Sequence, residues 1–522
     1  MSRPASFVPQ ASAAPAATSW MTAQTARWIG ITAWFVLVLT GGGRVVGSDE
    51  VTMLDLSRAM LRGGIAVPVG ATLDGPDGRH YTKNAAGQAV LALPLVGVAE
   101  IATAHLPLSG PRRTLALRFA VSFFNAAVVA LLLAAFYTSA RALGVAVPGA
   151  LDAALMLGFT TPIWVYAKSF MAEPLQALGL LLALAGSARA ALGEPRQAWW
   201  AGLGVLLAVS VKLSMVPLAL ACLVPLTRAR WTSWLPPALM LALALAGHAA
   251  YDRARFGTVW ETGYGAQATL AAYTTPLMTG LYGLLLSSGK GLMWFAPALW
   301  LAIPGGILMR RAGAAQGRAA IGVAIALVVA LGLYSRFEHW AGDGSFGPRY
   351  LVPLLPLAFL PVAFFLHRAG RWRRTLAALL ATAGLAVQIG GVAIYFGAQM
   401  REAGDYPYTR ALNDPLFMHE SHFVPRHSPI LGHWRMLIRN AGEHLDRKLP
   451  KLTGAGEADP RTGLGSPDQE ALLHALDFWW LYMLYAGLPP LPVVVGLLLL
   501  LFTAAWAALR MLVIADEEAR TL

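Results

Sequence analysis

The sequence predicts an all-α integral membrane protein with about twelve transmembrane helices, interfacial amphipathic helices in the first outer loop and a small outer cap. Two observations predict this class. Of the 522 residues, 57% are hydrophobic and only 13% are charged, against about 25% charged residues in soluble domains. Apolar runs also recur along nearly the whole chain, each about long enough to cross a bilayer core. These observations argue against a soluble globular protein.

The apolar runs define the candidate spans, whose number is uncertain by about two. Their boundaries are weakest around Lys212 and in the last run, which contains Pro489 and Pro490. The candidate spans are residues 27–43, 114–139, 150–166, 172–190, 198–211, 213–227, 233–250, 291–309, 319–335, 349–367, 374–397 and 479–510.

Arginines fix the predicted orientation of these spans. The net charge is +13, and the short loops that alternate along the chain carry it, as the positive-inside rule requires of cytoplasmic loops. This pattern predicts a multi-pass protein of the bacterial inner membrane with both termini in the cytoplasm, and it explains the charge without a nucleic-acid partner. The arginines concerned are Arg141, Arg189, Arg196, Arg228, Arg230, Arg310, Arg311, Arg318, Arg368, Arg371, Arg373, Arg374 and Arg510.

The long polar segments then lie on the outer side and define the predicted organisation. Residues 1–26, rich in Ala, Pro and Ser, are expected to be a disordered cytoplasmic tail. Residues 27–397 form the transmembrane domain, which includes the first outer loop at 44–113. Residues 398–478 form the outer segment, and residues 479–522 form the last helix and a cytoplasmic tail.

The first outer loop contains two apolar stretches that we expect to lie in the membrane interface. Val51, Leu54 and Met60 alternate with charged residues in the way typical of an amphipathic helix. Residues 88–105 are apolar but interrupted by Pro94 and Glu100. If this second stretch crossed the membrane, the arginine-rich loops would change sides, so an interfacial helix fits better.

The acidic pair Asp49-Glu50 follows the first span directly. Carboxylates at a membrane surface are costly unless they are solvated, paired or bound to metal. One interpretation of Asp49 is a helix N-cap. The other is a general base that deprotonates an acceptor hydroxyl. Glu50 would then orient this base or share a divalent cation, Mg²⁺ or Mn²⁺, with Asp49.

An acidic pair after the first span, followed by two interfacial helices, resembles the GT-C glycosyltransferases, which include protein O-mannosyltransferases and the lipid A aminoarabinose transferase. Residues 80–94 resemble the Tyr-x-Lys segment between the interfacial helices of that group, although residues 84–86 replace its usual prolines. The resemblance implies that Lys83 contacts the donor phosphate and that Tyr81 lies near the substrate. Further similar segments are residues 164–174, 211–212, 280–291 and 344–353.

Two other cations are candidates for binding the donor phosphate. Arg349 follows Gly347-Pro348 and offers a planar fork to a phosphate or carboxylate, or else it extends to lipid head groups. Lys290 lies in the glycine-rich loop 280–291, which suits an anion if its backbone N–H groups are free, or else is a flexible turn. Glu338 and Asp343 lie close to Arg349 in sequence and could pair with it.

Glu173 and Tyr264 complete the candidate site. A carboxylate at membrane depth usually faces a cavity or a partner, and for Glu173 a supporting role is favoured over direct catalysis. Tyr264 could stack on a sugar ring, or belong to the aromatic belt at the interface.

The resemblance implies an inverting glycosyltransferase that moves a sugar from a polyprenyl-phosphate donor to a lipid, glycan or protein acceptor on the periplasmic face. The alternatives are a transporter or flippase for a lipid-linked or anionic solute, and a non-catalytic subunit of a membrane complex. A transporter needs polar groups that are reachable from both membrane faces. The candidate residues gather on one face only.

Overall fold

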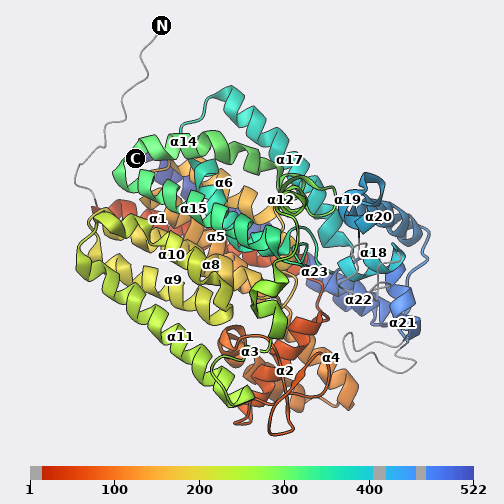
Figure 1. The fold of residues 1–522 in the computed structure, drawn as a ribbon. Helices are drawn as coiled ribbons and strands as arrows, with labels where there is room; N and C mark the ends of the chain where they lie inside the picture. Colours follow the sequence, from red (N-terminus) through yellow and green to blue (C-terminus); the bar gives the residue numbers. More distant parts are fainter. Residues whose placement is uncertain (1–14, 343, 404–418, 454–465, 522) are drawn as a thin grey trace.

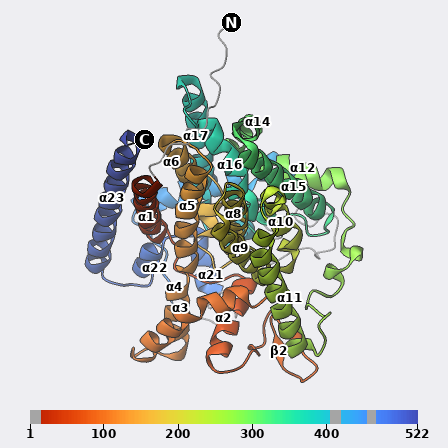
Figure 2. The same ribbon diagram turned by 90° about the vertical axis from the view of Figure 1, so that its left-hand side faces the viewer.

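The computed structural model describes residues 15–342, 344–403, 419–453 and 466–521, and it is an all-α bundle, as predicted (Figure 1). Its helices run side by side along one direction (Figure 2). The bundle consists of α1 (Pro15–Leu39), α5 (Phe124–Ala142), α6 (Val147–Phe159), α8 (Glu173–Ala191), α9 (Ala198–Val211), α10 (Val216–Cys222), α11 (Leu235–Phe256), α14 (Ala302–Ala312), α15 (Ala314–Arg336), α16 (Leu355–Leu366), α17 (Arg371–Ala393) and α23 (Pro490–Arg520). Three further short helices are α7 (Ile163–Tyr166), α12 (Leu277–Leu286) and α13 (Leu292–Phe295).

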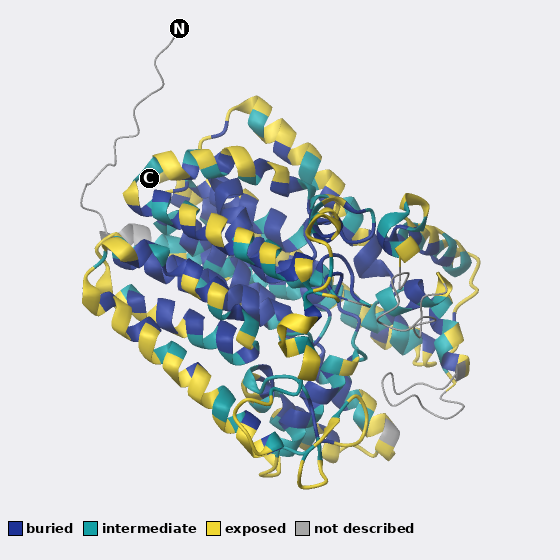
Figure 3. Ribbon diagram, in the orientation of Figure 1, coloured by how far each residue is buried: buried dark blue, intermediate teal, exposed yellow. Residues whose placement is uncertain are grey.

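The protein is a multi-pass membrane protein by the length and composition of its helices. Within the described ranges, eight helical segments are long and apolar enough to cross a bilayer, and several bundle helices are shorter. The predicted count of about twelve is therefore not confirmed. Interior positions of the bundle are buried, whereas α11 exposes its outer face (Figure 3). Many large apolar side chains of α23 are exposed as well. Phe502 of α23 is 70% exposed, as expected of a surface in contact with lipid.

The start of α1 and the end of α23 lie together at one end of the bundle. The carboxylate of Glu518, on α23, is fully buried. It accepts hydrogen bonds of 2.6 Å from Thr22 and Thr25 of α1. It also accepts a bond of 2.6 Å from Tyr137 and one of 2.9 Å from Arg141, both on α5. Four donors thus compensate for the buried charge and hold three helices together.

The first outer loop folds against the opposite end of the bundle (Figures 1 and 2). It contains α2 (Ser48–Leu61), a hairpin of β1 (Leu73–Asp74) and β2 (His80–Tyr81), and α3 (Gly87–Ala104), and α4 (Gly110–Val121) leads from it into α5. Helices α2 and α3 pack together through a hydrogen bond of 3.0 Å from Ser57 to the Ala89 carbonyl and an ion pair of 2.6 Å between Arg58 and Glu100. Helix α3 is apolar enough to span, but it packs on α2 at the end of the bundle.

The outer segment adds a helical cap at the same end as the first outer loop. It comprises α18 (Phe396–Glu402), α19 (His419–Phe423), α20 (Pro429–Leu445), α21 (Ser466–Ala471) and α22 (Trp479–Tyr485). The cap is joined to the bundle by backbone hydrogen bonds, including one of 2.9 Å from Trp479 to the Gly41 carbonyl at the end of the first span.

Two predicted boundaries are wrong. Residues 15–26 belong to α1 rather than to a disordered tail, and Thr22 and Thr25 anchor this part of the helix to Glu518. Residues 1–14 lie outside the described ranges. The predicted last span, 479–510, is divided: α22 ends at Tyr485, Gly487 adopts a φ of +84°, and Pro489-Pro490 begins α23. Glycine tolerates this left-handed conformation, and proline is well accommodated at a helix start.

Candidate active site

A cavity of about 690 Å³ opens at the end of the bundle opposite to Glu518. It is formed where several helices begin or end: the start of α2, the start of α8, the ends of α9, α11, α15 and α17, and the 3-10 helix η8 (Arg349–Leu354) that precedes α16. Loops from the first outer loop and the cap complete its walls. The charged and aromatic lining residues include Arg44, Asp49, Glu50, Lys83, Tyr166, Lys168, Glu173, Lys212, Tyr264, Arg349, Tyr350 and Asp477.

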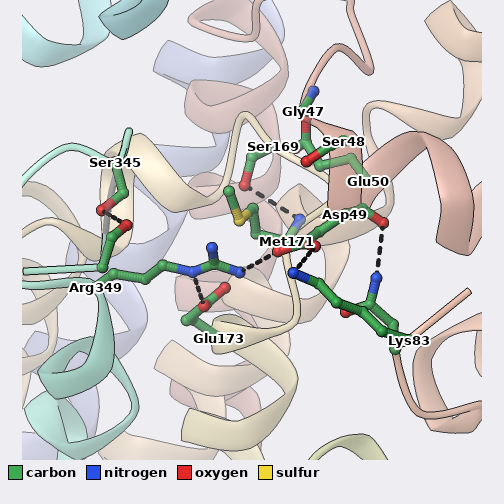
Figure 4. A network of polar contacts seen from close by, with 12 residues as sticks. Gly47, Ser48, Asp49, Glu50, Lys83, Ser169, Met171, Glu173, Ser345 and Arg349 are labelled. Carbon is green, nitrogen blue, oxygen red and sulfur yellow. Dashed lines mark hydrogen bonds and ion pairs between the residues drawn. The ribbon is translucent and has the colours of Figure 1, made fainter. Parts of the chain in front are cut away.

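Asp49 lies in the first turn of α2 and is held by cations from two distant parts of the chain. Arg349, 300 residues further along, donates from Nη2 to Asp49 Oδ2 at 3.0 Å. The same guanidinium donates from Nε to Glu173 Oε1 at 2.5 Å. Figure 4 shows Arg349 reaching between the two carboxylates, with Lys83 on the other side of Asp49. Arg349 thus connects Asp49 to Glu173, and Lys83 lies near the second carboxylate oxygen of Asp49. Together these contacts fix the position and the orientation of the Asp49 carboxylate.

Lys83 is the second cation at Asp49. Its Nζ lies 3.7 Å from Asp49 Oδ1, and its side chain is 42% exposed, which leaves it free to turn toward a ligand. The Lys83 Nζ also lies 5.9 Å from the ring centroid of Tyr264. Buried Arg255 fixes the loop before it by donating to the carbonyl of Thr82, while Asp252 neutralises Arg255.

These cations keep Asp49 ionised. Burial by itself would raise the pKa of Asp49, but the attraction of Arg349 and then of Lys83 outweighs it and lowers the pKa from 3.8 to about 2. Asp49 is therefore a carboxylate at every physiological pH, able to accept a proton but shielded by its partners. A ligand that draws Lys83 away from Asp49 would raise the pKa of Asp49 and make this carboxylate a stronger base.

Lys212 is a further cation of the cavity. It ends α9 in extended backbone, with φ of −158° and ψ of 122°. Its Nζ lies 4.9 Å from the ring centroid of Tyr350, which is stacked on Tyr334 at 4.7 Å. The sequence singled out Lys212 only as an isolated charge in an apolar stretch. Its position at a helix end facing this cavity emerges only from the fold.

Glu50 has a structural contact that the sequence did not predict. Its Oε2 accepts hydrogen bonds from the backbone N–H groups of Gly47 at 2.6 Å and Val46 at 3.2 Å, and its Oε1 accepts one from Phe170 at 2.5 Å. Glu50, rather than Asp49, thus caps α2. Burial raises the pKa of Glu50 even though these bonds oppose the rise.

The acidic pair does not fit a divalent cation. Both oxygens of Glu50 bind backbone N–H groups, and both oxygens of Asp49 face cations. Across the described residues, His, Cys, Asp and Glu side chains form no group of three that could hold a metal ion. We therefore derive no step through a metal.

Lys290 lies behind the cavity rather than in it, contrary to the prediction. It is 1% exposed, and its Nζ donates to the Ser345 carbonyl at 2.6 Å. The backbone N–H groups expected to bind an anion are also used: Gly289 donates to the His422 carbonyl at 3.0 Å and Gly291 to the Ser287 carbonyl at 2.8 Å. Lys290 thus supports the segment that leads to Arg349.

Two other predicted residues point elsewhere. Tyr81 is buried, and its hydroxyl donates to Asp77 Oδ2 at 2.7 Å inside the hairpin turn. Glu338 does not line the cavity, although its neighbour His339 does; its Oε1 lies 3.4 Å from His339 Nε2. Asp343 lies outside the described residues. Sequence proximity to Arg349 did not determine the ion pairs, because the partners come from other helices.

The cavity lining contains a second group of charged residues that the sequence analysis did not bring together. Buried Asp477 accepts hydrogen bonds from Lys168 at 2.9 Å, from Tyr482 at 2.8 Å and from Arg44. The pKa of Asp477 is lowered, since attraction to Arg44 and Lys168 outweighs the opposing effect of burial. Asp477 and Arg44 were unremarkable charges in polar segments, and no spacing in the sequence connects them.

Comparisons with known proteins give one remote similarity. No protein-family model matches the chain, and no curated protein is similar to it in sequence. Two solved structures are similar in fold, both of ArnT from Cupriavidus metallidurans. The apo structure is 15% identical with a TM-score of 0.46, and the structure bound to undecaprenyl phosphate is 14% identical with a TM-score of 0.47. Each comparison covers 88% of this chain and 85% of the other. A similarity this remote does not assign a reaction.

Proposed function

We propose that this protein is a GT-C-type glycosyltransferase that moves a sugar from a polyprenyl-phosphate donor to an acceptor hydroxyl. The observation that carries the proposal is the convergence of Asp49 with Lys83, Lys212 and Arg349 around one deep cavity. The resemblance of the first outer loop to the GT-C group suggested the first two of these residues, and the cavity supplies a place for a lipid head group.

The mechanism is a single displacement. Asp49 accepts the proton of the acceptor hydroxyl as the oxygen attacks the anomeric carbon. The bond between that carbon and the phosphate oxygen breaks, and the lipid phosphate leaves with both electrons. Lys83 and Lys212 face the leaving group and stabilise its negative charge, because they are held in place before the reaction. Arg349 aligns Asp49 by binding it and Glu173 together.

The cavity belongs to the outer, periplasmic face in this proposal. The predicted cytoplasmic arginines, such as Arg141 and Arg189, end the helices at the end where Glu518 lies. The cavity opens at the other end. The positive-inside rule then puts both termini and these arginines in the cytoplasm of a bacterial inner membrane.

Incubation of the purified, reconstituted protein with radiolabelled undecaprenyl-phosphate sugars and cell-envelope acceptors tests the proposal. Transfer of label to lipid, glycan or protein is expected. Movement of the intact labelled lipid across sealed vesicles, without transfer, would instead support the transporter alternative. A subunit without catalytic activity would show neither.

A further inference from the structure

Two buried polar groups on one wall of the cavity are not satisfied among the described residues: Oε2 of Glu173 has no hydrogen-bond partner, and the hydroxyl of Tyr166 has only a weak interaction with Ser345 that falls short of hydrogen-bond geometry. Glu173 is 2% exposed and Tyr166 is 4% exposed. Both residues line the cavity, and they lie on consecutive helices, α7 and α8. A buried polar group without a partner typically costs about 1–3 kcal/mol, so this wall is complementary to a ligand that supplies hydrogen bonds.

The two groups differ in chemistry from the cations around Asp49. Arg349 holds Glu173 through Oε1 at 2.5 Å, so Oε2 is a fixed acceptor with negative charge. The Tyr166 hydroxyl can donate or accept. A phosphate would be repelled by Glu173 and suits Lys83 and Lys212 instead. The groups that suit Glu173 and Tyr166 together are neutral hydroxyls, such as those of a sugar ring.

We propose that Glu173 and Tyr166 form a subsite for hydroxyl groups of the transferred sugar. The assignment rests on the proposed function and deepens it by naming the substrate class: a sugar with free hydroxyls at this wall, not one with a carboxylate or sulfate there. Arg349 then holds Glu173 in the sugar subsite and also aligns Asp49, so it connects the two parts of the site.

Binding of two kinds of lipid separates this subsite from the phosphate site. The probes are undecaprenyl phosphate and the same lipid carrying glucose, galactose, mannose or arabinose, titrated into the full-length protein in nanodiscs. Wild type is expected to bind at least one glycosylated lipid more tightly than undecaprenyl phosphate. Tyr166→Phe is expected to weaken that binding about three- to tenfold, the usual effect of one lost hydrogen bond, and to leave the Kd for undecaprenyl phosphate unchanged.

Two further variants complete the design. Glu173→Gln replaces the acceptor Oε2 by a donor and is expected to weaken glycosylated-lipid binding about tenfold or more. Tyr251→Phe is the matched control, because the Tyr251 hydroxyl is also buried without a partner but Tyr251 does not line the cavity. Analogues of the tightest-binding glycosylated lipid that each lack one sugar hydroxyl are then compared. One of them should bind wild type and Tyr166→Phe equally, and the hydroxyl that it lacks is the one that contacts Tyr166.

The outcomes are distinguishable. Equal losses for both kinds of lipid in Tyr166→Phe would show that Tyr166 serves the phosphate site or the fold, and would overturn the subsite. Wild type that binds undecaprenyl phosphate but gains nothing from any sugar would also overturn it. Wild type that binds none of these lipids would refute the proposed function itself, and the subsite with it.

Discussion

Replacing Arg349 by Gln tests the electrostatics of the site most fully. Arg349 joins Asp49 and Glu173, and its side chain is 18% exposed. Its attraction is the largest of the cationic effects that lower the pKa of Asp49 from 3.8 to about 2, ahead of those of Lys83 and Lys212. That lowering corresponds to about 2 kcal/mol in favour of the carboxylate, at about 1.4 kcal/mol for each pH unit.

The variant leaves Lys83 as the cation at Asp49. Lys83 is 42% exposed and 3.7 Å away, and exposed ion pairs contribute about 1 kcal/mol or less. Burial and the unpaired charge of Glu173 then dominate, and both raise the pKa of Asp49. We expect it to exceed 3.8, so the acid limb of kcat/KM should move upward by about two pH units or more. Loss of one partner from a buried pair also costs about 3–5 kcal/mol of stability.

The assay is the initial rate of sugar transfer between pH 4 and 8, with Tm measured on the same samples. The wild-type limb lies below this range, so its rate should be flat toward pH 4, whereas the rate of Arg349→Gln should fall there. Arg44→Gln is the matched control, because it breaks a similarly buried ion pair with Asp477, elsewhere in the lining of the cavity. The control should lower Tm without moving the acid limb. An unchanged limb in Arg349→Gln, or an equal shift in both variants, would refute the assignment of Asp49 as the titrating base.

Two other predictions concern single lysines. Lys83→Met should weaken binding of undecaprenyl phosphate about tenfold or more, the effect of one lost charge-assisted hydrogen bond. Lys451→Met, at an exposed position, serves as the control. Equal Kd values for the two variants would remove Lys83 from the phosphate site. Lys290→Met should lower kcat and Tm with little effect on the Kd for undecaprenyl phosphate, because Lys290 holds the Ser345 carbonyl behind the cavity. A loss of lipid affinity as large as that of Lys83→Met would show that Lys290 contacts the lipid directly.

The fold class was predictable from simple patterns, and so were two residues that the structure places together in the cavity lining. Apolar runs predicted an all-α membrane protein, and this is confirmed. The chemistry of an acid after the first span singled out Asp49, and Arg349 followed from its glycine-proline context. The structure brings both residues into contact although 300 positions separate them.

The remaining errors have physical causes. Glu50 caps α2 because Gly47 is the N-cap residue, and a cap depends on backbone torsions at one residue. Lys290 was misplaced because sequence does not show which side of a loop faces a cavity. Asp477 and Lys168 are buried together through packing between the cap and the bundle, which no local pattern reports.

The most direct test of the account compares Asp49→Asn with wild type in a single-turnover reaction at saturating undecaprenyl-phosphate sugar. Asparagine keeps the size of the side chain but cannot accept the proton. The account predicts a transfer rate about 10²–10⁴-fold lower, as for loss of a general base, with the Kd for the donor within about threefold of wild type. Transfer by Asp49→Asn at the wild-type rate would contradict the central claim that this carboxylate is the base.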